Sequence, residues 1–147
     1  MSKSIWIILT FVAGAMLPIQ GGMNAKLGKS ITSPVYASMI SFVVGAAVLI
    51  VYILATKQSV SLSGIKTAPA YVWLAGALGA FYVTVVILAF PKIGPALTFG
   101  LVVAGQMAIA VTLEHFNILV AQQHSINIWR VVGMTMILMG VVIIRKF

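Results

Sequence analysis

The stretch "IWIILTFVAGAMLPIQGGMNAKL", residues 5–27, decides the fold class of this chain. About 20 predominantly apolar residues are enough for a helix to cross the hydrocarbon core of a bilayer. The first half of the stretch is apolar apart from Thr10, whereas the second half holds Pro18, Gln20 and Asn24. Length and composition predict a transmembrane helix, and the polar second half indicates that one of its faces does not meet lipid.

The composition of the whole chain supports the same class. Of 147 residues, 62% are hydrophobic and 7% are charged, whereas soluble domains carry about 25% charged residues. Such a chain cannot cover a water-facing surface, so we expect an integral membrane protein. The net charge of +8 comes from bases that lie between apolar runs, where they anchor helix ends at the headgroups. We therefore expect lipid contact and no nucleic-acid partner.

Five apolar runs predict an all-α fold with five transmembrane helices. We expect one transmembrane domain over residues 1–147 and no extramembrane module. The first run can also be read as a secretory signal, but the four runs that follow favour a retained helix. The predicted helices cover about 5–27, 34–55, 69–90, 94–115 and 126–144.

Proline residues mark the ends of the predicted helices. Pro34, Pro69 and Pro95 stand at helix starts, where the missing backbone N–H has no helical partner to lose. Pro91 is expected to close the third helix. The short link "PKIGP", residues 91–95, then predicts an antiparallel hairpin of the third and fourth helices.

The distribution of basic residues indicates a dual topology. An odd number of spans places the termini on opposite sides, and the side with more Lys and Arg normally sets the orientation. The N-terminal side holds four bases and the other side five, so neither orientation is favoured and we predict an antiparallel homodimer. The bases are Lys3, Lys57, Lys66 and Arg130 on the first side and Lys26, Lys29, Lys92, Arg145 and Lys146 on the second.

Such a dimer would reproduce a known transporter architecture. Two oppositely inserted five-helix units give ten helices related by a two-fold axis in the membrane plane. Inverted-topology repeats of this kind are typical of secondary transporters, because exchanging the conformations of the two halves turns an inward-open state outward.

Polar residues of the first helix predict a cavity wall. Gln20 and Asn24 are four residues apart and share one helix face. Pro18 removes a backbone hydrogen bond, and with Gly21 and Gly22 it predicts a kink. Irregular helices are tolerated at membrane depth where they line a water-filled cavity.

Three further polar residues allow two readings each. Gln106 lies near the middle of the fourth helix, where it could bind substrate or hydrogen-bond to a neighbouring helix. Glu114 is the one acid of the chain, and His115 follows it. These two could exchange a proton for substrate, since a histidine titrates near neutrality. They could equally form an interfacial pair with Arg130 or with lipid headgroups.

Several motifs in order along the chain resemble those of a known group. They are "IQGGMNAKLGKSITSPVYASMISFVVG" at 19–45, "GALGAFYV" at 76–83, "PKIGPALT" at 91–98, "AGQ" at 104–106 and "EHFN" at 114–117. Together they resemble the YdcZ-type five-helix branch of the drug/metabolite transporter (DMT) superfamily. The group's Asp-His-Phe-Gly element appears as "EHFN", in which Glu114 keeps the acid and Asn117 replaces the glycine.

The resemblance implies a five-helix half of a ten-helix DMT transporter in the bacterial cytoplasmic (inner) membrane. It also implies action as a homodimer or as a pair with a similar short protein. We therefore expect a secondary transporter, an exporter of a small organic metabolite or drug-like compound, with possible proton coupling. The expected substrate-binding residues are Gln20, Asn24, Tyr82 and Gln106, and the coupling candidates are Glu114 and His115.

Two other classes stay open at this point. A small dual-topology channel fits the odd number of spans. A non-transporting membrane subunit that supports a partner is the other class, although the polar face of the first helix would then have no purpose. We expect no enzyme, because the sequence offers no nucleophile–base pair and no cluster of metal ligands. No cofactor, metal or disulfide is expected either, and the chain has no cysteine.

Overall fold

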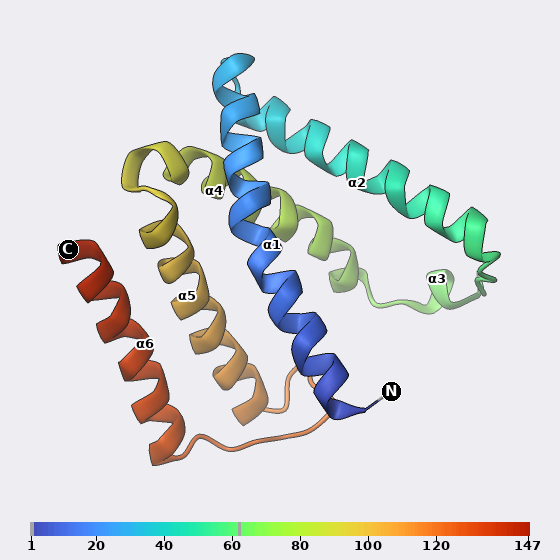
Figure 1. Ribbon diagram of the computed structural model, residues 1–147. Helices are drawn as coiled ribbons and strands as arrows, with labels where there is room; N and C mark the ends of the chain where they lie inside the picture. The colour runs from blue at the N-terminus through green and yellow to red at the C-terminus, as the bar shows by residue number, and fades with distance from the viewer. Residues whose placement is uncertain (1, 62) are drawn as a thin grey trace. The chain divides into compact units, whose positions relative to one another are not determined.

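A computed structural model describes residues 2–61 and 63–147, so residues 1 and 62 of the predicted domain lie outside it (Figure 1). Helices make up 83% of the structure, and no β-strand occurs in the described ranges, which confirms the predicted all-α class. The elements are α1 (Lys3–Ser30), α2 (Pro34–Thr56), α3 (Ser63–Thr67), the 3₁₀ turn η1 (Ala70–Trp73), α4 (Leu74–Ile93), α5 (Pro95–His115) and α6 (Ile128–Lys146).

Five spans in the described parts of the chain are long and apolar enough to cross a membrane, as the sequence predicts. Their limits differ from the predicted ones by a few residues. The third span begins with η1, for which Pro69 is the N-cap, and α4 continues through Pro91 to Ile93. The prediction that Pro91 closes this helix is therefore wrong. In the last turn, a proline removes only one backbone bond before the helix ends.

Local sequence explains where two of the helices begin. The Ser33 hydroxyl accepts a hydrogen bond from the backbone N–H of Tyr36, and Pro34 is the first helical residue of α2. Gly94 is the residue between α4 and α5, and its φ of 77° lies in the left-handed region that glycine adopts at no steric cost. Pro95 then opens α5. These signals stop one helix and start the next within a very short link.

The chain forms two compact units, Met1–Lys92 and Ile93–Phe147. The first contains α1, α2 and α4, and the second contains α5 and α6. The prediction of one domain over the whole chain stays a prediction.

Small residues bring the helices of the first unit into contact. A Cβ on Gly28 would lie 3.0 Å from Cγ2 of Ile87 and 3.5 Å from Cβ of Ala37. A Cβ on Gly22 would lie 3.2 Å from Cζ of Phe90. Without a hydrophobic force between helices in lipid, close approach at small residues is a main source of association. Gly22 is therefore a contact point of α1 for α4, and Gly28 is one for both α2 and α4.

Helix α1 is unbroken from Lys3 to Ser30, although Pro18 lies inside it. Gly21 is buried and Gly22 packs on Phe90. These glycines therefore pack against neighbouring helices and do not end the helix. The kink expected near Pro18 stays a prediction.

The second unit is held by a similar contact. A Cβ on Gly100 of α5 would lie 3.1 Å from Cγ2 of Val141 on α6. Val141 and Val111 are both 6% exposed. The two helices therefore pack along faces where a small residue meets a branched one.

Most other large apolar side chains point outward. Phe11 is 78% exposed, and Leu54 and Phe81 are each 71% exposed. A soluble monomer rarely exposes apolar patches of this extent. Acyl chains or further protein helices are the environment that these surfaces fit.

We predict that Gly28→Leu lowers the thermal unfolding temperature of the detergent-solubilised protein. The added side chain meets Ile87 at a contact that is already closed, and overpacking costs about 1–3 kcal/mol. Gly14→Leu in the same helix is the matched control, because nothing lies within 4 Å of its Cβ position. Equal unfolding temperatures for the two variants would contradict this packing.

Candidate functional site

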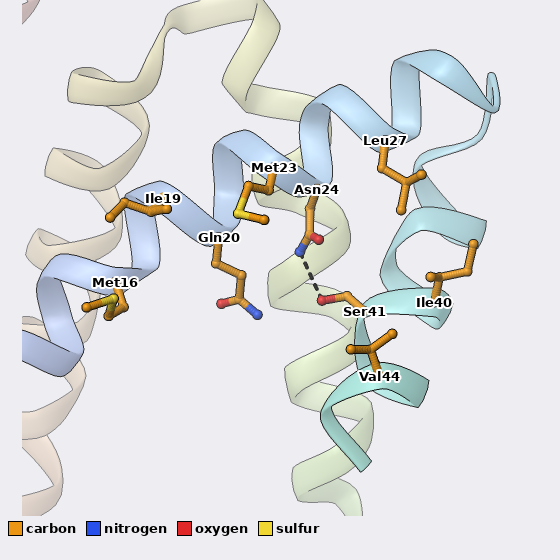
Figure 2. A pocket seen from close by; sticks show the side chains of 9 residues that line it. All are labelled: Met16, Ile19, Gln20, Met23, Asn24, Leu27, Ile40, Ser41 and Val44. Carbon is orange, nitrogen blue, oxygen red and sulfur yellow. Dashed lines mark hydrogen bonds between the residues drawn. The ribbon is translucent and has the colours of Figure 1, made fainter. Parts of the chain in front are cut away.

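A groove of about 540 Å³ lies between α1 and α2 (Figure 2). Ligand sites in proteins commonly have volumes of about 300–1,000 Å³. The α1 residues in its wall recur every three or four positions, so they share one helix face. Its apolar lining is Met16, Ile19, Met23, Leu27, Ile40 and Val44, and its polar lining is Gln20, Asn24 and Ser41.

Two hydrogen bonds between side chains connect the helices near this groove. Asn24 is 8% exposed, and its Nδ2 donates to Oγ of Ser41 across 3.1 Å. The hydroxyl of Ser38 on α2 lies 2.8 Å from that of Thr84 on α4, and the two share a hydrogen bond. Such bonds join helices at a depth where lipid offers no partner. Asn24 therefore links α1 to α2, in addition to lining the groove.

Gln20 differs from Asn24 in having no hydrogen-bond partner among the described residues. Its side chain lies exposed in the groove one helical turn from Asn24 (Figure 2), and its amide makes no hydrogen bond with any residue that the structure describes. It also lines two adjoining hollows, one beside Tyr82 and one beside Phe42. A free amide at the meeting point of three hollows is available to a ligand.

The structure brings three of the four predicted substrate-binding residues together. Gln20, Asn24 and Tyr82 line the same small hollow between α1 and α4. Its volume of about 10 Å³ holds no more than about one water. Tyr82 thus lies behind the amides and not in the groove itself.

Gln106 belongs to the other unit. It is exposed on α5 and is not among the residues that line the groove. Its proposed place beside Gln20 and Asn24 stays a prediction.

Sequence reasoning did not find Ser41 as the partner of Asn24. A signal was present, because Asn24 lies six residues before the last residue of α1 and Ser41 lies seven residues after the first residue of α2, which are nearly matching distances from the turn between them. Residues at matching distances from a tight helical turn lie at the same depth.

The predicted coupling residues form a second cluster, in which Glu114 is paired. Nη1 of Arg130 lies 2.7 Å from Oε2 of Glu114, with the side chains 27% and 33% exposed, respectively. The same Nη1 donates to the carbonyl oxygen of His124 across 3.2 Å. Glu114 is thus paired with Arg130, and the role of Glu114 and His115 in proton coupling stays a prediction.

His115, the last residue of α5, makes two hydrogen bonds with the loop between α5 and α6. Its Nδ1 accepts a hydrogen bond from the backbone N–H of Ile126 across 3.2 Å. Its carbonyl oxygen accepts from Nε2 of Gln123 across 2.8 Å. Both contacts fix the loop between α5 and α6.

Asn117 follows the C-cap residue of α5 and has the left-handed backbone conformation that glycine usually adopts at this position. Its φ is 55°, and asparagine is among the few residues that adopt the left-handed region readily. The backbone N–H of Asn117 donates to the carbonyl of Glu114, and that of Ile118 donates to the carbonyl of Leu113. This pair of bonds is the Schellman motif. Asparagine therefore preserves the turn in which the resembling group has glycine.

The five apolar spans define a multi-pass membrane protein in class. A family described as "Putative inner membrane exporter, YdcZ" matches residues 5–143, which include nearly all of the five spans. The chain belongs to this family of DMT type, which confirms the resemblance and places the protein in the inner membrane. The family is one of transporters and not of enzymes. No curated protein and no solved structure matches the chain.

We predict that Glu114→Gln lowers the unfolding temperature because it leaves Arg130 without its carboxylate. The double variant Glu114→Gln/Arg130→Gln should recover part of the loss. Residues in direct contact show coupling energies of about 0.5–3 kcal/mol in double-mutant cycles. Thermal unfolding of the wild type, both single variants and the double variant gives this energy. Strictly additive effects would show that the pair does not stabilise the loop.

Proposed function

We propose that the chain is a secondary transporter that exports a small organic metabolite or drug-like compound, with the groove between α1 and α2 as its substrate site. The free amide of Gln20 in that groove is the observation that carries the proposal. A polar group without a partner is costly at membrane depth, and such groups mark substrate pathways. Its family membership agrees with export.

The lining of the groove suggests the class of substrate. All nine side chains in its wall are uncharged. The one acidic residue of the chain, Glu114 on α5, is paired with Arg130 on α6. We therefore propose a neutral, mainly apolar compound with one or two hydrogen-bonding groups. Met16 and Met23 are flexible and polarisable, so the wall can adapt to several related shapes.

A second copy completes the proposed transporter. The groove opens on the surface of the first unit, where its amide would otherwise face lipid. An antiparallel copy would cover this surface and give the inverted symmetry on which alternating access depends. The balance of basic residues on the two sides supports this arrangement.

Glu114 and Arg130 offer a route to proton coupling within this proposal. A proton on Glu114 would neutralise the carboxylate and release Nη1 of Arg130, which also binds the loop at His124. The contact between the ends of α5 and α6 would then depend on the occupancy of one acid. The exported substrate would then be exchanged for protons, with this contact coupling the two movements.

We predict that Gln20→Ala raises the KM for export about tenfold or less, with an unfolding temperature close to that of the wild type. One hydrogen bond contributes about 0.5–1.5 kcal/mol, and the Gln20 amide bonds to no described residue whose loss would destabilise the fold. Cells that overproduce the protein are first screened for resistance to a panel of uncharged compounds. Flux of the best compound is then measured in proteoliposomes.

Gln106→Ala is measured beside it, because Gln106 is an exposed glutamine outside the groove that is also a predicted substrate-binding residue. An unchanged KM for Gln20→Ala would remove the groove as the substrate site. An equal effect of both variants would instead place Gln106 in the same site. Flux that does not saturate would favour a channel.

We predict that both chain ends are labelled from each side of the membrane. The chain has no cysteine, so Ser2→Cys and Phe147→Cys report on one terminus each. If both orientations occur, an impermeant thiol reagent labels about half of each variant in intact cells and the rest after lysis. Full labelling of one terminus and none of the other would contradict dual topology and require an oppositely inserted partner protein.

A further inference from the structure

A second hollow of the first unit lies at the end of the helices, away from the amide groove. It lies between the C-terminal half of α1, the start of α2 and the end of α4, and its volume is about 560 Å³. Figure 1 shows these helix ends at the same end of the first unit. We call it the lysine groove, after Lys26, Lys29 and Lys92 in its wall.

The three lysines come from two helices. Lys26 and Lys29 are three residues apart on α1, so they share one face. Lys92 stands in the last turn of α4. All three are exposed, and all fall at the same membrane surface because α1 and α4 end there. Three positive charges thus surround one hollow.

No side-chain carboxylate of the chain is free to neutralise these charges. Glu114 is the one acidic residue of the sequence, and Arg130 already binds it. Like charges around a common hollow repel one another, and the repulsion is stronger beside apolar walls than in water. The groove therefore attracts an anion from outside the chain.

The walls of the groove favour one kind of anion. Ile87, Leu88 and Phe90 of α4 form an apolar surface beside the lysines. A free phosphate would use the charges and leave this surface unused, whereas a phospholipid has an anionic headgroup and acyl chains in one molecule. Basic pockets between transmembrane helices are a known mode of recognition of anionic lipids.

We propose that the lysine groove binds one anionic phospholipid, with its phosphate among Lys26, Lys29 and Lys92 and an acyl chain along Ile87, Leu88 and Phe90. The base of the groove is the contact of α1 with α4, where Gly22 meets Phe90 and Gly28 meets Ile87. A lipid bound there touches both helices and holds their ends together. This inference is independent of the substrate of the transporter.

Native mass spectrometry of the purified protein tests the proposal. The protein is equilibrated with equimolar phosphatidylglycerol and phosphatidylcholine of the same acyl chains, and the bound lipids are counted by headgroup. The groove variant is Lys26→Gln/Lys29→Gln/Lys92→Gln. The matched control is Lys3→Gln/Lys57→Gln/Lys66→Gln, which removes the same number of charges from residues outside the groove.

We expect wild type and control to retain phosphatidylglycerol in preference to phosphatidylcholine, and the groove variant to lose this preference by about tenfold or more, since each lysine near an anionic surface contributes to binding. The variant Lys26→Arg/Lys29→Arg/Lys92→Arg should keep the preference. This arginine variant separates loss of charge from loss of fold.

Other outcomes would overturn the proposal. Equal losses in the groove variant and the control would show a general attraction of bases to headgroups. No loss in either would show that the groove holds no anionic lipid. Displacement of bound phosphatidylglycerol by millimolar inorganic phosphate alone would show a simple anion site. A changed ratio of monomer to dimer with an unchanged lipid preference would show that a second copy occupies the groove.

Discussion

The structure depends on one constraint, namely that the hydrocarbon core offers polar groups no hydrogen-bond partner. The backbone meets this constraint with five long helices, and side chains meet it in pairs. Asn24 bonds to Ser41, and Ser38 bonds to Thr84. These bonds lie beside the glycine contacts of α1, so the polar pairs and the close packing fix the same three helices.

Gln20 stands out because it does not follow this pattern. It faces a groove and bonds to no described residue, while Asn24 one turn away is paired. The charged groups show the same contrast. Glu114 and Arg130 neutralise each other, whereas Lys26, Lys29 and Lys92 have no side-chain carboxylate left to bind, since Glu114 is the one acidic residue. We therefore propose that the substrate binds at Gln20 and that the lipid binds at the lysine groove.

The sequence predicts the spans well because bilayer thickness fixes their length and because Ser33-Pro34 and Gly94-Pro95 stop and start helices locally. It predicts less about side-chain partners, since these depend on how each helix is rotated about its axis. Periodicity placed Gln20 and Asn24 on one face, but it could not choose between ligand and Ser41 for Asn24. It named Arg130 as a possible partner of Glu114, and the structure shows this ion pair.

The central claim is that Gln20 lies in a water-accessible groove and not against lipid. Because the chain has no cysteine, Gln20→Cys carries a single thiol at this position. Val43→Cys is the control, since Val43 lies near the same depth on α2, is 62% exposed and does not line the groove. A small charged thiol reagent needs a hydrated thiolate. The account predicts rapid labelling of Gln20→Cys and little of Val43→Cys, and equally slow labelling of both would contradict it.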